Sequence, residues 1–323
     1  MKASTLSSGL RIVFLGTPAF AVASLKALHE SHHEIVGVVT APDRPAGRGR
    51  KPRPSAVKEF AEAHQLPLFQ PEKLRDEQFQ SSLRALKADL FVVVAFRMMP
   101  KELWSMPPMG TFNLHASLLP DYRGAAPINW SIWNGDRETG LTTFFINEVI
   151  DSGEWLMQRH CLITPEDNAG SLHDKLMNLG ASLVVETANG LENGTLQPQA
   201  QDLSRPMRPA PKIFTEDTWL DPQGSAKQLH QQVRALSPYP GAKIRLSDAV
   251  GKQVEWKILQ TRVIKSVFQH KRKVLLMEKR LIIPCAEGGL EIISLQPEGK
   301  KPMLSKDFLN GFKQQPDFEI ISN

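Results

Sequence analysis

The sequence predicts an α/β domain built on a mainly parallel sheet, followed by a smaller all-β barrel. Three observations lead to this fold class. The chain has 323 residues, and at roughly 100–200 residues per domain this length favours two domains. The first half alternates short apolar runs with helical patterns, which indicates parallel strands joined by helices. Beyond Thr218 the apolar runs are short and follow one another across turn residues, as in small barrels.

The apolar runs of the first domain are continuous, which is typical of strands in a sheet covered on both faces. We expect these strands at residues 11–15, 34–40, 66–69, 89–96, 111–115 and 141–147. Helical patterns lie between them at residues 19–29, 55–64, 73–86, 127–133 and 171–191. Ser55 is a suitable N-cap for the second of these helices. The expected architecture is a Rossmann-like domain.

The texture of the chain changes between Leu196 and Lys212, where four prolines interrupt the apolar pattern. We interpret this stretch as part of a linker. The expected division is a first domain at 1–202, a linker at 203–216 and a barrel at 217–323. Strands of the barrel are expected at residues 243–246, 254–263, 273–277, 280–284 and 290–295.

Charge is unevenly distributed along the chain. The sequence holds 39 Lys and Arg against 34 Asp and Glu, which gives a net charge of +5. Residues 1–216 carry 22 basic and 23 acidic residues, a net −1, whereas residues 217–323 carry 17 and 11, a net +6. A basic module attached to a neutral one suggests a polyanionic partner. A lysine-rich surface that serves solubility is the alternative explanation.

The cysteine count and the first residues exclude several classes of protein. Cys161 and Cys285 are the two cysteines, too few for a disulfide scaffold or a four-cysteine zinc module. We interpret both as small packing residues. Residues 1–16 hold no apolar stretch long enough for a signal peptide or a membrane span, so a cytoplasmic protein is expected.

Two segments mimic known motifs. Residues 29–33 (HESHH) satisfy the H-E-x-x-H pattern of zinc proteases, which needs both histidines on one face of a helix. The helical pattern ends near His29 and a strand begins at Glu34, so we interpret the match as accidental. Residues 16–21 (GTPAFA) lack the second and third glycines of a dinucleotide fingerprint, so no nicotinamide or flavin site is expected.

Residues 110–130 are the most informative stretch. Asn113 and His115 point to one face of the expected strand, because side chains alternate along a strand. They lie near its carboxyl end, where open α/β sheets bind ligands. An amide can stabilise an oxyanion, and a histidine can take up a proton near neutral pH. The alternative is a polar strand end with a hydrogen-bonded core histidine.

Asp151 is the candidate for a third member, because a carboxylate can orient an imidazole and balance its charge. It follows the strand expected at 141–147 and lies in the turn at 149–153. An ordinary turn aspartate is the alternative interpretation. Spacing along the chain does not place Asp151 beside His115.

Eight segments, taken in order, match the motifs of one family. They are GTP with FA at 16–21, PDRPAGRG at 42–49, NLH at 113–115, SLLP at 117–120, RGAAPI at 123–128, DSG at 151–153, RALSPYPG at 234–241 and GKK at 299–301. The chain resembles the methionyl-tRNA formyltransferase family over nearly its whole length. The N-x-H, SLLP and D-x-G set marks the wider group that uses 10-formyltetrahydrofolate. The PDRPAGRG loop and the added C-terminal module narrow the resemblance to the tRNA enzymes.

The resemblance implies the reaction and the residues that perform it. A formyl group would pass from 10-formyltetrahydrofolate, a co-substrate, to the α-amino group of methionine on initiator methionyl-tRNA, for translation initiation. Asn113, His115 and Asp151 match the family's catalytic trio. The loop that contacts the folate matches Ser117, Leu118, Leu119 and Pro120. No metal and no nucleophilic cysteine is needed, no membrane contact is expected, and the protein is expected to be a monomer.

The resemblance also implies two tRNA contacts. The loop that carries Arg48 would wedge against the end of the acceptor stem, and the C-terminal module would be an OB-like barrel that grips tRNA through basic residues. Such basic stretches favour phosphate contact. The expected tRNA-binding residues are Arg44, Arg48, Arg50, Lys51, Arg53, Lys271, Arg272 and Lys273.

One segment departs from the family pattern. Residues 95–100 (AFRMMP) are one residue shorter than the family's A-Y-G-x-I-hydrophobic-P, and Arg97 stands in the glycine region. In the family this loop borders the folate pocket. Arg97 could reach a carboxylate or could structure the loop.

Two other functions remain open at this level. A folate-dependent formyltransferase for a small amine, such as a nucleotide sugar or glycinamide ribonucleotide, would share the trio without needing the basic loop or barrel. A non-catalytic tRNA-binding protein would bind tRNA with a strong salt dependence and transfer no formyl group.

Overall fold

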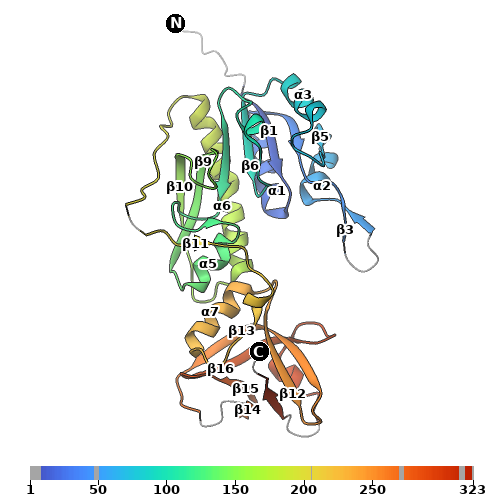
Figure 1. Ribbon diagram of the computed structural model, residues 1–323, viewed down its shortest axis with the longest axis vertical. Coiled ribbons are helices and arrows are strands. Elements are labelled where there is room, and N and C mark those ends of the chain that lie inside the picture. Colours follow the sequence, from blue (N-terminus) through green and yellow to red (C-terminus); the bar gives the residue numbers. More distant parts are fainter. Residues whose placement is uncertain (1–8, 47–50, 205, 269–272, 313–316, 322–323) are drawn as a thin grey trace. The chain divides into compact units, whose positions relative to one another are not determined.

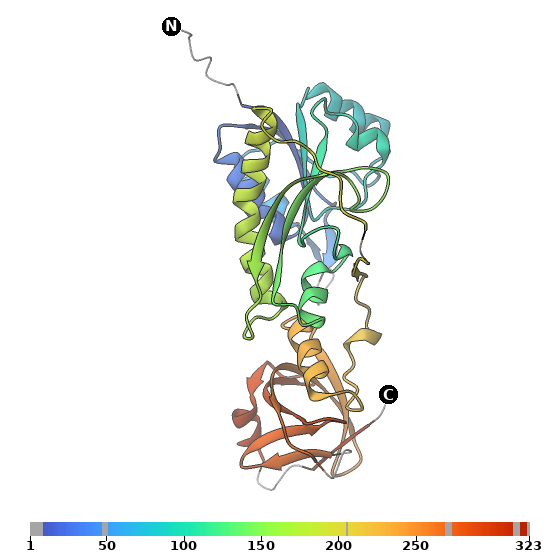
Figure 2. The same ribbon diagram turned by 90° about the vertical axis from the view of Figure 1, so that its left-hand side faces the viewer.

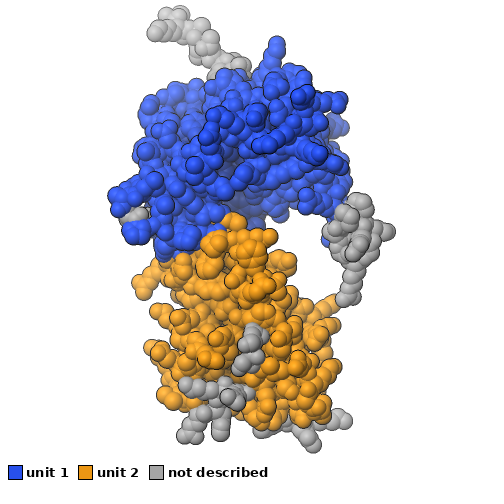
Figure 3. Space-filling view, viewed as in Figure 1, with its two compact units in different colours: residues 1–124, 138–162, 173–210 blue, residues 125–137, 163–172, 211–323 orange. Residues whose placement is uncertain are grey.

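The computed structural model describes residues 9–46, 51–204, 206–268, 273–312 and 317–321. Contacts divide the chain into two compact units, coloured separately in Figure 3. Unit 1 comprises residues 1–124, 138–162 and 173–210, and unit 2 comprises residues 125–137, 163–172 and 211–323. Two segments from the first half of the chain thus belong to the same unit as the barrel. The domain boundaries expected from the sequence stay a prediction.

Unit 1 is built on a seven-stranded sheet of described residues, in the order β10-β9-β7-β6-β1-β2-β5 (Figure 1). Its parallel strands are β1 (Arg11–Gly16), β2 (Glu34–Val39), β5 (Leu68–Phe69), β6 (Leu90–Val94) and β7 (Thr111–His115). β9 (Glu138–Phe145) runs antiparallel to β7, and β10 (Trp155–Leu162) runs antiparallel to β9. The predicted mainly parallel α/β sheet is confirmed. β10 was not predicted, because its alternating Gln, Arg and His residues belong to a half-exposed edge strand.

Helices lie between the strands of unit 1 much as the apolar periods indicated. They are α1 (Ala19–His29), α2 (Ala56–Ala63), α3 (Glu77–Ala85), α4 (Lys101–Trp104) and α6 (Ala169–Glu192), the last of which begins in unit 2. Ser55 caps α2 as predicted, since its hydroxyl accepts the Lys58 N–H at 3.0 Å. On one face of the sheet, Leu83 of α3 and Leu103 of α4 pack against Phe91 and Val93 of β6.

The basic segment after β2 forms a short hairpin. β3 (Arg44–Ala46) and β4 (Lys51–Arg53) pair antiparallel, with Arg44 opposite Arg53. The sequence predicted no strand here, because proline in each strand and the polar composition mask any alternation.

Unit 2 contains the predicted barrel, which is confirmed. Six antiparallel strands close a ring in which β13 pairs with β16: β12 (Ala242–Asp248), β13 (Gln253–Ile264), β14 (Lys273–Met277), β15 (Arg280–Pro284), β16 (Gly289–Pro297) and β18 (Phe318–Ile320). β17 (Met303–Leu304) adds to β16, and α8 (Ser305–Leu309) follows it. Trp256 fills the core, where it packs edge-on against Phe308 and Phe318.

Helix α7 (Ala226–Leu236) in unit 2 was not predicted. Ser225 and Gln228 form a capping box at its start, a signal that the short apolar runs nearby obscured. α7 packs on α5 (Pro127–Trp133), and the Asn129 amide donates to Ala235 O at 2.7 Å. Arg234 donates to Thr164 O and Asp167 O, both at 2.7 Å. The RALSPYPG motif thus binds both inserted segments to the barrel unit.

Two smaller expectations concern the cysteines and the membrane. Cys161 and Cys285 are both buried free thiols, in agreement with a packing role. Burial raises the pKa of the Cys285 thiol to about 11. No helix in the described ranges combines the length and the hydropathy needed to cross a bilayer.

Candidate active site

Two polar side chains share one face of β7 near its carboxyl end. Leu114 is buried and lies against Gly180 of α6. Asn113 and His115 therefore point to the opposite face, since side chains alternate along a strand. Asn113 is partly buried, and its amide has no hydrogen-bond partner among the residues the structure describes. An open donor is thus available beside the histidine.

His115 is 6% exposed, and its two ring nitrogens have different surroundings. Nε2 lies 2.8 Å from the carbonyl oxygen of Tyr122. Because a carbonyl oxygen only accepts, Nε2 carries the proton and donates it there. Nδ1 lies 3.7 Å from Asp151 Oδ2, too far for a hydrogen bond. In the neutral ring Nδ1 therefore holds a lone pair, and it is the nitrogen that can take up a proton.

The structure brings Asp151 to His115, which the spacing along the chain could not do. The Gly124 N–H donates to Asp151 Oδ2 at 2.9 Å and fixes the carboxylate. Gln201 donates to the carbonyl oxygens of Asp151 and Gly153 at 2.9 and 2.8 Å. The three candidate catalytic residues thus lie in one unit and along one edge of the sheet.

The D-x-G sequence has a backbone explanation. Asp151 has φ of +52°, a left-handed conformation that aspartate tolerates better than most residues. At Gly153 a Cβ atom would lie 1.7 Å from Phe145 O, so only glycine fits. Within the turn, Asn147 Oδ1 accepts the Val149 N–H and the Ser152 hydroxyl, both at 2.9 Å. The turn therefore holds Asp151 in a fixed position.

A second set of residues supports the histidine, and sequence reasoning missed most of it. β8 (Arg123–Gly124) pairs in parallel with β11 (Pro209–Ala210), and the Tyr122 N–H donates to Arg208 O at 2.6 Å. Arg123 donates to Gln201 Oε1 at 2.7 Å, and burial lowers the pKa of this arginine. Tyr122 acts through its carbonyl oxygen and Gln201 lies at the edge of the predicted linker, so neither side chain carried a signal in the sequence.

The predicted folate loop follows β7 directly. The Ser117 hydroxyl is buried and donates to Asp121 O at 2.6 Å, so it serves the loop itself. Thr142 accepts the Leu119 N–H and donates to Ser117 O. Leu119 and Pro120 are buried, whereas Leu118 is partly exposed beside Gly140. The loop is internally braced, and its contact with folate stays a prediction.

Arg97, the residue that departs from the family pattern, contacts backbone. Its Nη1 donates to Glu72 O at 2.9 Å and its Nη2 donates to Pro71 O. Burial, with Arg44 nearby, lowers the pKa of the Arg97 guanidinium. Arg97 thus ties the loop after β6 to the segment after β5.

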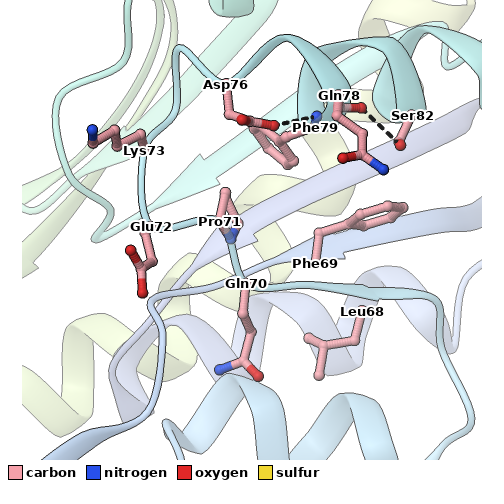
Figure 4. Close-up of a pocket in the computed structure, with 10 residues that line it drawn as sticks. All are labelled: Leu68, Phe69, Gln70, Pro71, Glu72, Lys73, Asp76, Gln78, Phe79 and Ser82. Atoms are coloured by element: carbon pink, nitrogen blue, oxygen red, sulfur yellow. Dashed lines mark hydrogen bonds between the residues drawn. The ribbon is translucent and has the colours of Figure 1, made fainter.

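A surface pocket of about 580 Å³ lies next to this segment (Figure 4). It is lined by residues 68–73, 76, 78, 79 and 82. Asp76 caps α3 there, since its carboxylate accepts the Phe79 N–H at 2.8 Å. None of the predicted site residues lines this pocket, so it is separate from the His115 constellation.

The predicted tRNA-binding residues are only partly described. Arg44 and Arg53 are exposed on the hairpin, in agreement with contact to a partner. Lys273 forms ion pairs with Asp317 at 3.0 Å and Glu319 at 3.5 Å, which raise the pKa of its amino group. The side chain of Lys51, and the whole of Arg48, Arg50, Lys271 and Arg272, lie outside the described residues.

One cluster in the described ranges has ligand atoms spaced for a metal ion: His32, His33 and Glu192. It includes the last two residues of the H-E-x-x-H match. His33 Nδ1 accepts the Leu10 N–H at 3.0 Å, so Nε2 carries the proton and donates to Asn189 Oδ1 at 2.9 Å. Both nitrogens are thus in use, and this tautomer does not suit a metal ligand.

Comparison with known proteins covers both parts of the chain. The model of the formyl transferase family matches residues 10–188, and the model of the formyl transferase C-terminal domain matches residues 212–313. A methionyl-tRNA formyltransferase of Parabacteroides distasonis is 48% identical over 320 residues, which cover 96% of this chain and 98% of that protein. One of Bacteroides thetaiotaomicron is 46% identical over 316 residues, with the same coverage. The chain belongs to the methionyl-tRNA formyltransferase family. This membership confirms the resemblance seen in the motifs.

Solved structures are similar in fold to this member of the methionyl-tRNA formyltransferase family. An N-formyltransferase from Helicobacter canadensis, solved with folinic acid and dTDP-3-aminofucose, has a TM-score of 0.64 at 18% identity. The match covers 88% of this chain and 98% of that one. At this identity the likeness shows the fold alone.

Proposed function

We propose that the protein transfers a formyl group from 10-formyltetrahydrofolate to the α-amino group of methionine on initiator methionyl-tRNA, for translation initiation. The observation that carries this proposal is the His115 geometry, with Nε2 bound to Tyr122 O and Nδ1 open opposite Asp151. Family membership over the full length supports the choice of substrates. 10-Formyltetrahydrofolate supplies the formyl carbon.

His115 acts as the proton carrier in this proposal. Nδ1 takes the proton that the amino group of methionine loses as it attacks the formyl carbon, and returns it to the departing folate nitrogen. In between, the ring is an imidazolium whose Nδ1–H points to Asp151. The carboxylate, held by the Gly124 N–H, stabilises that charge. The Tyr122 carbonyl keeps the other nitrogen protonated throughout.

Asn113 acts as the electrostatic partner. As the amine adds, the formyl oxygen becomes negative, and an amide N–H aimed at it lowers the barrier. The amide of Asn113 fits this task, since it has no partner among the described residues and shares a face with His115. We expect the 117–120 loop to contact folate through Leu118, because the Ser117 hydroxyl is committed to Asp121.

The test measures formylation of charged initiator tRNA by the wild-type protein, with glycinamide ribonucleotide and an amino nucleotide sugar as competing acceptors. We expect transfer to the tRNA and at most trace transfer to the small amines. His115→Ala should abolish most of the transfer. His160→Ala is the matched control, because His160 is an exposed histidine on the same sheet.

Each alternative outcome has a clear meaning. Efficient transfer to a small amine would replace the proposed acceptor. Binding of tRNA without any transfer would favour a non-catalytic binding protein. Equal rates for the wild-type and His115→Ala proteins would refute the mechanism.

Three further properties stay predictions. We propose that the reaction uses no metal, so that treatment with a chelator followed by dialysis leaves turnover unchanged. The monomeric state and the location in the cytoplasm rest on the sequence.

A further inference from the structure

Two aromatic and three basic residues form a strip along the outer face of β12 and β13. Lys243 and Arg245 of β12 point outward, because Ala242, Ile244 and Leu246 between and beside them are buried in the barrel. Together with Lys257 of β13, Trp219 and Tyr239 they form what we call the aromatic–basic strip: Trp219, Tyr239, Lys243, Arg245 and Lys257. All five belong to unit 2.

Direct contacts connect the members of the strip. Lys243 lies opposite Lys257 in the antiparallel pairing of β12 and β13. The Lys243 amino group lies 5.4 Å from the centre of the Trp219 ring, and the Arg245 guanidinium lies 4.6 Å from it. At the other end, a Cβ atom on Gly241 would lie 3.1 Å from Lys257 Cδ, which places Tyr239 two residues from the lysine stem. The strip is therefore continuous.

The strip carries positive charge that the described part of the protein does not balance. Like charges directly opposite each other destabilise a sheet, and Lys243 and Lys257 form no ion pair with any described acid. Only Arg245 is paired, with Glu255 at 3.1 Å. Lys273, by contrast, is neutralised by Asp317 and Glu319. The open cations of the described barrel thus lie on β12 and β13 rather than at Lys273.

Tyr239 adds a flat apolar surface to these cations. It is 81% exposed, although tyrosine usually buries much of its ring. Prolines precede and follow it, and the Gly241 N–H donates to Leu236 O at 2.8 Å, which closes the turn. The ring is held in solvent by a rigid turn, so little freedom would be lost when a second ring stacks on it.

We propose that the aromatic–basic strip is the surface on which the barrel binds RNA. Lys243 and Lys257 contact phosphates, and the Tyr239 ring stacks on an unpaired base. Open cations beside exposed aromatic rings are the combination that binds nucleic acid without reading its sequence. That the RNA is methionyl-tRNA rests on the proposed function. The proposal moves the barrel contact away from Lys273.

The test uses the full-length protein and measures the dissociation constant for methionyl-tRNA across a salt series. The variants are Lys243→Gln/Lys257→Gln and Tyr239→Ala. Loss of two phosphate contacts should lower the slope of log affinity against log salt by about 1.4 to 1.8. Tyr239→Ala should weaken binding by about fivefold or more, with little change in the slope.

Matched variants separate the strip from general effects. Lys243→Arg/Lys257→Arg and Tyr239→Phe keep the charge and the ring, and should bind tRNA as the wild type does. Lys227→Gln/Lys306→Gln removes two exposed lysines of unit 2 outside the strip and should also bind normally. Melting curves of every variant report on folding.

The outcomes distinguish this inference from the proposed function. Unchanged affinity and salt slope in the folded Gln and Ala variants would overturn the inference, even if the wild type formylates methionyl-tRNA. Weakened RNA binding in the strip variants, with no formylation by the wild type, would leave the strip in place and refute the proposed function.

Discussion

Two histidines at opposite edges of the same sheet are almost equally buried, yet only one has a ring nitrogen left over. His33 precedes β2 and is 5% exposed, and His115 ends β7 and is 6% exposed. His33 accepts the Leu10 N–H with Nδ1 and donates to Asn189 with Nε2. His115 uses Nε2 alone and leaves Nδ1 opposite Asp151.

The comparison teaches that burial does not identify a functional histidine. Burial lowers the pKa of His33, and the neighbouring His32 lowers it further, so the ring stays neutral and serves as a structural link. His115 lies at the carboxyl edge of the sheet, where α/β proteins bind ligands, and faces a fixed carboxylate. A free nitrogen and a charged partner make the difference.

The largest expected effect tests this comparison directly with paired alanine variants. His115→Ala should lower turnover about 100- to 10,000-fold, the usual range for loss of a general acid–base group. His33→Ala should leave turnover near the wild-type value but lower the free energy of unfolding by about 2–4 kcal/mol, because Leu10 N–H and Asn189 lose their partner. Formylation assays and denaturant melts of both proteins check this. Similar effects of the two variants on turnover would end the distinction.

The next effect sharpens the role of the β7 edge. Asn113→Ala removes the amide proposed to stabilise the oxyanion, and we expect turnover to fall about 100- to 1,000-fold. The substrate KM values should change much less, because the interaction forms in the transition state. Steady-state kinetics provide the measurement, with Asn193→Ala as a control on an exposed asparagine. Turnover within about threefold of the wild type would contradict the assignment.

A smaller effect concerns the partner of the open nitrogen. Asp151→Asn keeps an oxygen for the Gly124 N–H and tolerates the left-handed backbone. It removes the charge that faces His115 Nδ1, so we expect turnover to fall up to about a hundredfold, the effect of losing one charged contact of about 3 kcal/mol. Single-turnover kinetics would show whether the chemical step is slowed. An unchanged rate would mean that Asp151 is an ordinary turn residue.

The smallest effect extends the comparison to a third histidine, in unit 2. His230 donates to or accepts from Thr261 Oγ1 at 2.9 Å, and burial, with Arg234 nearby, lowers the pKa of its ring to about 4. Below pH 6.5 the unfolded chain binds a proton that the folded protein does not, so stability should fall as the pH drops from 8 to 5. The loss is about 2 kcal/mol.

His230→Gln should remove this acid-sensitive contribution. Denaturant melts of unit 2, followed at several pH values by the fluorescence of its tryptophans, provide the measurement. A pH dependence equal in both proteins would show that His230 is not its source.

Much of the fold was predictable because its signals are local. Continuous apolar runs marked the parallel strands, and Ser55 marked the start of α2. β10 and α7 escaped because each exposes one face, and their polar residues broke the apolar runs. The capping box at Ser225 was the one local sign of α7.

The candidate site divides in the same way. Strand alternation was enough to place Asn113 and His115 on one face, and the motifs pointed to Asp151. The carbonyl of Tyr122 and the amide of Gln201 were beyond prediction, since backbone groups look alike in every sequence and Gln201 reaches the site from 50 residues away.

The sequence by itself determined the residue types, the two kinds of domain and the family resemblance, because these depend on composition and short-range periodicity. Only the tertiary structure decided which nitrogen of His115 is free, that Asp151 faces it, and which lysines of the barrel lack a partner. Those facts depend on contacts between segments far apart in the chain. A charge or a hydrogen bond acts through the distance in space, and only folding sets that distance.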